Sequence, residues 1–139
     1  MTAKENAKRH GAKCNFFVSD LFSNINKKYD LIVSNPPYIP IRQKNTLSLT
    51  VKNFEPHNAL FAKDIYGIEF YEKIINQSVT FLNKNGYLAF ELGKGQYNYV
   101  RELFLRQNFS NIKIFKDLDN IERVTITQYF KKNSFQDNV

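Results

Sequence analysis

The stretch from Asp30 to Ile39 constrains the fold of this chain more than any other. Its apolar run, residues 31–33, is typical of a short strand buried on both faces of a sheet. Pro36 and Pro37 then end the strand, because a proline lacks a backbone N–H and has a fixed φ. The residue before a proline is pushed toward extended geometry, so Asn35 is expected at the carboxyl end of the strand. Ligands bind at that edge of open α/β sheets, so the sequence predicts a ligand site there.

The residues Asn35 to Tyr38 suit the methylation of a planar nitrogen. An amide or aromatic amino group is a poor nucleophile because its lone pair is conjugated, so catalysis depends on orienting it toward an electrophilic methyl group. The side-chain oxygen of Asn35 can accept one N–H of that group, and the carbonyl of Pro36 can accept the other. Pro37 stiffens the turn, and Tyr38 supplies a flat wall for a planar substrate. The alternative is a plain Asn-Pro turn with a packed tyrosine.

This tetrapeptide resembles the Asn/Asp-Pro-Pro-Tyr motif of S-adenosylmethionine-dependent methyltransferases that modify amino or amide nitrogens. Further blocks are similar, in their order and spacing, to the protein-(glutamine-N5) methyltransferase family, often called HemK or PrmC. These blocks are Val51 with Phe54-Glu55-Pro56, Ala59-Leu60-Phe61, Gly67 with Phe70-Tyr71, Glu91-Leu92-Gly93 with Gln96, and Asp117-Leu118 with Glu122-Arg123-Val124. The resemblance runs over nearly the whole chain.

The resemblance implies a substrate: the glutamine of the Gly-Gly-Gln loop in peptide-chain release factors, which are the expected partners. Asn35 and Pro36 would be the catalytic residues that orient the glutamine amide. Pro37, Tyr38 and Glu55 would complete the substrate site. Glu55 lies in a long polar stretch after the motif, where it could contact the substrate or only anchor the loop.

The resemblance also implies S-adenosyl-L-methionine as the cofactor. Asp20 would accept a hydrogen bond from the adenine amino group, Leu21 would pack on the ring, and Asn35 would lie beside the cofactor as well. An aspartate in a loop or at a helix start is the other reading of Asp20. The family's glycine-rich cofactor turn has no counterpart here, since no glycine precedes Gly11. We therefore expect weak cofactor binding by the chain alone, and a complementing N-terminal half as a partner.

Hydrophobic spacing and turn signals predict an α/β chain. Taken with the resemblance, they predict a partial Rossmann-like class I methyltransferase sheet lacking its first two strands. We expect residues 1–131 to form the C-terminal portion of a catalytic domain and 132–139 to be a frayed tail. The expected helices cover residues 2–11, 68–82 and 97–107, and the expected strands 15–18, 29–34, 87–92, 111–115 and 123–130, with a turn at Asn85-Gly86.

Composition limits the remaining classes of function. The single cysteine, Cys14, excludes an internal disulfide and a cysteine-cluster metal site, and we expect it to be buried. No metal site is expected. The apolar runs are too short for a membrane span, and no apolar signal region follows Met1, so a cytoplasmic location is expected. The net charge of +7 favours an anionic partner, but it is not gathered into one stripe, so nucleic acid is expected only indirectly.

Two other functions are compatible with these residues. One is methylation of the adenine amino group in DNA or RNA, which uses the same tetrapeptide on a flipped base. The other is a truncated, inactive remnant or binding module, which the missing glycine turn supports. The Phe54-Glu55-Pro56 and Ala59-Leu60-Phe61 blocks favour glutamine methylation over adenine methylation.

Overall fold

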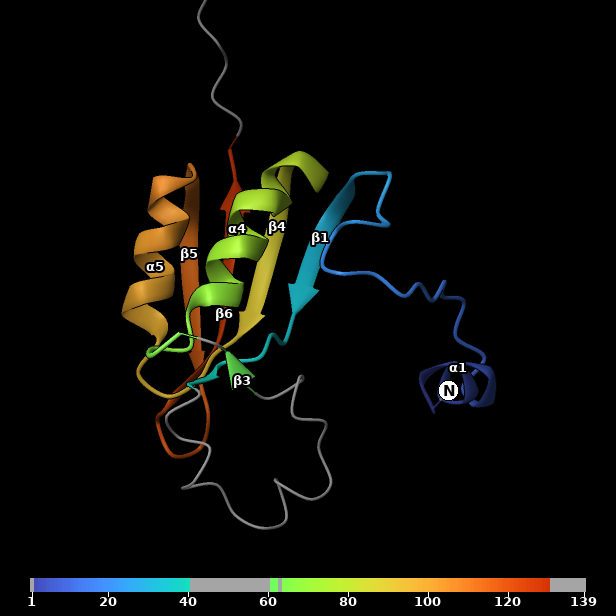
Figure 1. Cartoon of the computed structure of the whole chain (residues 1–139), viewed down its shortest axis with the longest axis horizontal. Coiled ribbons are helices and arrows are strands. Elements are labelled where there is room, and N and C mark those ends of the chain that lie inside the picture. Colours follow the sequence, from blue (N-terminus) through green and yellow to red (C-terminus); the bar gives the residue numbers. More distant parts are fainter. Residues whose placement is uncertain (1, 41–60, 63, 131–139) are drawn as a thin grey trace, which may run out of the picture.

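A computed structural model describes residues 2–40, 61–62 and 64–130 of the 139-residue chain. In chain order the elements are α1 (Thr2–Arg9), β1 (Tyr29–Ser34), β2 (Ile39–Pro40), β3 (Phe61–Ala62), α4 (Glu69–Phe81), β4 (Leu82–Glu91), α5 (Tyr97–Arg106), β5 (Phe109–Lys116) and β6 (Glu122–Tyr129). Figure 1 shows a sheet with α4 and α5 in front of it and α1 standing apart. The predicted tail, residues 132–139, lies outside the described part.

The main sheet has four strands in the order β1-β4-β6-β5. β1 and β4 run parallel, while β6 is antiparallel to both of its neighbours. β2 and β3 form a separate two-stranded pair next to the carboxyl ends of β1 and β4. The predicted α/β class and the predicted strands 29–34, 111–115 and 123–130 are confirmed, with small differences in their limits.

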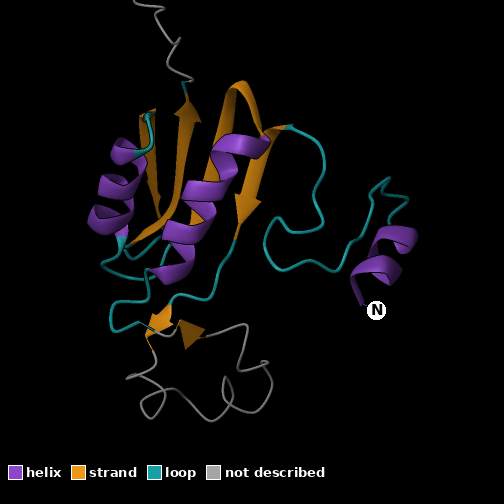
Figure 2. Ribbon diagram, turned by 45° about the horizontal axis from the view of Figure 1, so that its top comes forward, coloured by secondary structure: helices purple, strands orange, loops and turns teal. Residues whose placement is uncertain are grey.

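Both long helices cover the same face of this sheet (Figure 2), and the core lies between the two layers. The apolar positions of α4 recur at helical spacing, so one side of the helix is buried. The buried residues include Tyr71, Ile74, Ile75, Leu88, Phe90, Val100, Phe104 and Phe109. Tyr71 packs edge-on against Phe90 with ring centroids 5.2 Å apart. This core fixes where β4 ends, and therefore where the residues after it lie.

The opposite face of the sheet is bare within the described residues. Leu31 and Val33 of β1 are 51% and 69% exposed, although their sequence predicts burial on both faces. The reason is that β1 is an edge strand, and no described element packs over that face. Other large apolar residues on the same face, Tyr87, Val124 and Phe115, are exposed as well.

The segment before β1 departs from the prediction. α1 is a helix, and Gly11 follows it with φ +64°, as predicted for a glycine cap. Residues 15–18 do not form a strand, and Cys14 is exposed instead of buried. A strand needs a neighbour to bond its backbone groups, and no described strand lies beside this segment. The apolar spacing was therefore insufficient to predict a strand.

Two further differences concern β4 and β6. Asn85-Gly86 is not a turn between elements: β4 continues through it as an irregularity, and Asn85 has φ +62°. β6 lies between β4 and β5, and it buries the polar residues Thr125 and Thr127 completely. Their hydroxyls donate to the carbonyls of Lys113 (3.0 Å) and Ser110 (2.8 Å), where the register of β5 shifts.

Candidate active site

The Asn35–Tyr38 turn lies at the carboxyl end of β1, next to the carboxyl end of the parallel strand β4. Asn35 is exposed, Pro36 is buried, and Pro37 and Tyr38 are half-buried. The prolines therefore anchor the turn against the domain while the asparagine amide stays accessible to solvent. An exposed carboxamide on a rigid support can serve as a hydrogen-bond acceptor for a ligand.

Tyr38 connects this turn to the end of β4. Its hydroxyl donates to Oε1 of Glu91, which is the last residue of that strand, across 3.3 Å. Burial raises the pKa of the Tyr38 phenol, and the negative charge of Glu91 raises it further. The phenol therefore stays protonated at neutral pH and keeps its hydrogen bond to the carboxylate.

Gln96, just before α5, makes a second connection to the turn. Its side-chain Nε2 donates to the backbone carbonyl of Tyr38 across 2.9 Å. The same amide also bonds the loop that precedes α4 and the loop that follows β4. Three separate loops therefore meet beside the turn.

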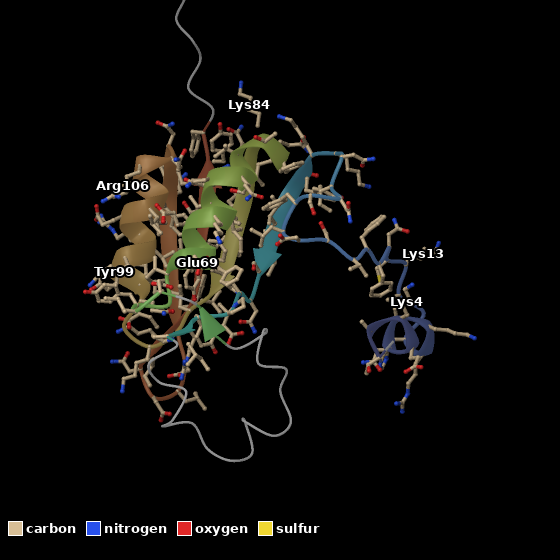
Figure 3. The ribbon with its side chains drawn as sticks, in the orientation of Figure 1. Lys4, Lys13, Glu69, Lys84, Tyr99 and Arg106 are labelled. Carbon is tan, nitrogen blue, oxygen red and sulfur yellow. The ribbon has the colours of Figure 1, made fainter. Side chains whose placement is uncertain are left out.

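A cavity of about 500 Å³, which we call the turn cavity, opens between these loops. Its described lining residues are Tyr38, Ile39, Pro40, Tyr66, Gly93, Lys94, Gly95, Gln96 and Tyr99. The rings of Tyr66 and Tyr99 stack on one another with centroids 5.5 Å apart. Figure 3 shows Tyr99 at the end of the sheet where the turn lies. Asn35 does not line this cavity, although Tyr38 does.

A second, smaller space of about 320 Å³ runs along β1, and we call it the β1 hollow. It is lined mostly by apolar side chains: Leu21, Phe22, Ile25, Tyr29, Leu31, Ile32, Val33, Ser34 and Ile74. Leu21, predicted to contact the cofactor, thus shares a hollow with Ser34, the residue before Asn35. Asp20 is exposed at the start of the adjoining turn, where its N–H donates to Ser23 Oγ (3.1 Å).

The predicted site residues are therefore not all brought together. Asn35, Pro36, Pro37 and Tyr38 form one turn, and Leu21 lines a neighbouring hollow. Glu55 lies outside the described residues. Glu91 and Gln96 hold the turn, yet the sequence analysis gave neither a role, although both belong to one of the blocks that carry the family resemblance.

The described part of the chain lacks two further kinds of feature. No three His, Cys, Asp or Glu side chains there group together as a metal site would require. Among the same residues, no helix is both long and apolar enough to cross a membrane.

The sequence is similar to several known proteins over most of its length. It is 44% identical over 117 residues to a release factor glutamine methyltransferase of Fusobacterium nucleatum, covering 82% of this chain and 32% of that one. It is 41% identical over 128 residues to the one of Francisella tularensis, covering 91% and 44%. Residues 1–55 also match the family model described as methyltransferase small domain. Over most of its length the chain is therefore similar to release factor glutamine methyltransferases, which confirms the resemblance found in the sequence.

The chain spans less than half the length of these relatives. Two solved structures share its fold. A methyltransferase from Pyrococcus furiosus gives a TM-score of 0.61 at 19% identity, covering 93% of this chain and 56% of that one. TrmN from Thermus thermophilus gives 0.58 at 16% identity, covering 92% and 32%. The predicted Rossmann-like fold class is thereby confirmed.

Proposed function

We propose that this chain is the part of an S-adenosylmethionine-dependent methyltransferase that orients the side-chain amide of the glutamine in the Gly-Gly-Gln loop of cytoplasmic release factors. One observation carries the proposal: an exposed asparagine amide at the carboxyl end of a parallel strand, followed by a buried proline and an anchored tyrosine. The names of the relatives support the choice of substrate.

In this proposal Asn35 and Pro36 hold the two N–H groups of the substrate amide. The Asn35 side-chain oxygen accepts one N–H and the Pro36 carbonyl accepts the other, so the nitrogen faces a single direction. Methylation replaces one N–H bond by an N–CH₃ bond, and the released proton passes to water, which reaches exposed Asn35. The gain comes from orientation, because both acceptors are positioned before the substrate arrives. Pro37, Tyr38 and Glu55 complete the proposed substrate site.

The residues that this chain offers fit part of the cofactor. The apolar β1 hollow, which Leu21 lines, suits a flat aromatic ring, and the exposed carboxylate of Asp20 lies beside Leu21. We therefore assign Asp20, Leu21 and Asn35 to the cofactor site. S-adenosylmethionine, when bound, would supply the electrophilic methyl group by loss of its S–CH₃ bond, leaving S-adenosylhomocysteine.

A complementing N-terminal half belongs to the same proposal. Among the described residues, β1 is an edge strand with no strand bonded along its outer side, and nothing covers the sheet face that carries Leu31 and Val33. Such an edge pairs readily with a further strand. The relatives carry more chain than this one spans, so they have the material to cover that surface.

A transfer assay tests the proposal against its two alternatives. The chain is incubated with methyl-labelled cofactor and either a release factor or adenine-containing DNA. Each mixture is prepared with and without the part of the Fusobacterium nucleatum relative that lies outside the matched residues. We expect label on the release factor in the complemented mixture only. Label on the DNA would instead support adenine methylation, and no label in any mixture would support an inactive remnant or binding module.

A further inference from the structure

Gln96 has an unusual set of contacts for a residue outside the proposed catalytic turn. It is only 6% exposed, and each polar atom of its side chain has a hydrogen-bond partner. Nε2 donates to the carbonyls of Tyr66 (2.8 Å), Tyr38 (2.9 Å) and Gly67 (3.3 Å). Because these partners are all acceptors, the nitrogen of the amide must be the atom that faces them.

The oxygen of the same amide faces donors. Oε1 accepts from the backbone N–H of Gly93 across 3.0 Å and lies 3.2 Å from the hydroxyl of Tyr71. That hydroxyl is also 2.9 Å from the carbonyl of Glu91, so its single proton is shared between two acceptors. One buried amide therefore joins the turn after β1 to the end of β4 and to the loop before α4.

Two glycines make this close approach sterically feasible. A Cβ on Gly67 would clash with the Tyr38 carbonyl oxygen and lie 2.6 Å from Gln96 Nε2, and Gly67 has φ +73°. A Cβ on Gly93 would lie 2.5 Å from Gln96 Oε1 and 2.9 Å from the Tyr38 ring. Because neither glycine carries a side chain, the backbone can approach the Gln96 amide closely. Close packing around the amide fixes its position.

We propose that Gln96 is the positioning residue of the site: its amide holds the Tyr38 end of the Asn35–Tyr38 turn against the sheet and so sets where Asn35 and Pro36 meet the substrate. This rests on the proposed function. Gln96 touches none of the reacting groups and acts through the Tyr38 carbonyl. Without it the carbonyls of Tyr38, Tyr66 and Gly67 would lose their shared donor.

A matched pair of substitutions tests this assignment. Gln96 and Gln107 flank α5 at its start and its end, and among the described contacts the side chain of Gln107 bonds only Asn76. Gln96→Glu keeps the shape and Oε1 but replaces the donor by an oxygen that faces three carbonyls. A negative charge favours a helix start over a helix end, so the helix dipole alone would make Gln107→Glu the more harmful change. We predict instead that Gln96→Glu is the more harmful of the two changes.

The first readout is the pKa of Tyr38, measured by NMR on chains labelled at tyrosine Cζ. The Tyr38 signal is assigned by its absence from the spectrum of the Tyr38→Phe variant. If the turn moves away from Glu91 in the Gln96→Glu variant, the pKa of Tyr38 falls toward its ordinary value of about 10. If the turn stays seated, the added negative charge raises that pKa. A fall in Gln96→Glu with no change in Gln107→Glu is the expected result, and a rise overturns the proposal. The signal of buried Tyr71 reports that the core remains folded.

The second readout is methyl transfer to a release factor in the complemented mixture. A misplaced turn lowers kcat on the order of 10²-fold, with a smaller change in KM, because orientation is lost. Equal kcat values in Gln96→Glu and Gln107→Glu overturn the proposal. If wild-type chain transfers no methyl group, the proposed function fails and the Tyr38 titration alone decides the role of Gln96. Should Gln96→Glu not fold, Gly93→Ala, which displaces the same amide, is expected to lower the pKa of Tyr38, and an unchanged value overturns the assignment.

Discussion

At the scale of single residues, two side-chain amides at the same end of the sheet differ in their exposure. Asn35 is exposed at the carboxyl end of β1, whereas Gln96 is buried and bonded through both of its polar atoms. A buried amide that is fully bonded rigidifies its surroundings, while an exposed one is available to a ligand. The contrast supports the proposed binding role of Asn35 and the proposed supporting role of Gln96.

Asn35→Ala tests the first of these roles. We expect methyl transfer in the complemented mixture to fall by about 10²–10³-fold, because a preorganised hydrogen-bond acceptor is lost. The free energy of unfolding should change by less than about 0.5 kcal/mol, since the side chain is exposed. Asn98→Ala, at an exposed position on α5, serves as the control and should leave transfer unchanged. Undiminished transfer by Asn35→Ala would contradict the role given to this residue.

The sequence predicts the role of a residue only where the pattern that reveals it is local. The Asn35–Tyr38 turn could be located because strand, prolines and tyrosine are consecutive. The role of Gln96 could not, because the carbonyls that it bonds lie 58, 30 and 29 residues away along the chain. The burial of Thr125 and Thr127 was equally hidden, since it depends on carbonyls of the neighbouring strand.

At the scale of elements, α4 owes its start to Asp64. The backbone N–H groups of Tyr66, Ile68 and Glu69 donate to the Asp64 carboxylate at 3.1, 2.9 and 3.2 Å. Partial burial raises the pKa of this carboxyl, but the three N–H donors outweigh it and hold the pKa below its ordinary value. The charged carboxylate therefore accepts from the N–H of Glu69 in the first turn of the helix and from two N–H groups just before it.

Asp64→Ala should lower the free energy of unfolding by about 1 kcal/mol at neutral pH, the usual loss for a helix-capping side chain. Because the folded pKa is depressed, the contribution is present above the unfolded pKa and is lost as the pH falls through the folded pKa. Urea unfolding should therefore show the gap between wild type and variant closing in acid. Asp119→Ala, at an exposed loop position, should unfold like wild type. A gap that is independent of pH would contradict this account.

The elements also show where hydrophobic spacing is a sufficient guide. Helices α4 and α5 were predicted nearly to the residue, because each buries one stripe against a sheet that is present. The strand expected at residues 15–18 did not form, although its residues have strand-forming character. A helix bonds its own backbone, whereas a strand depends on a partner strand that local sequence does not reveal.

At the scale of the whole molecule, helices cover one face of the sheet, and within the described residues nothing covers the other. The face under α4 and α5 is closely packed, while the opposite face exposes Leu31, Val33 and Tyr87. The β1 hollow lies along the free edge of the same sheet. The surface proposed for the cofactor is therefore only partly enclosed by the described residues.

We accordingly predict weak binding of S-adenosylmethionine by the chain alone, because little of the ligand surface would be removed from water. Titration calorimetry should give a dissociation constant weaker than about 1 mM for the isolated chain, near the lower end of measurable affinity. Adding the complementing half should bring the constant into the micromolar range. Micromolar binding by the chain alone would contradict the need for a second half.

Locating the transferred methyl group is the most direct test of the central claim. A release factor is incubated with the complemented chain and labelled cofactor, digested, and mapped by mass spectrometry. The orienting turn predicts a single methyl group on the side-chain nitrogen of the Gly-Gly-Gln glutamine. A methyl group on any other side chain, or on added DNA with none on that glutamine, would contradict the claim.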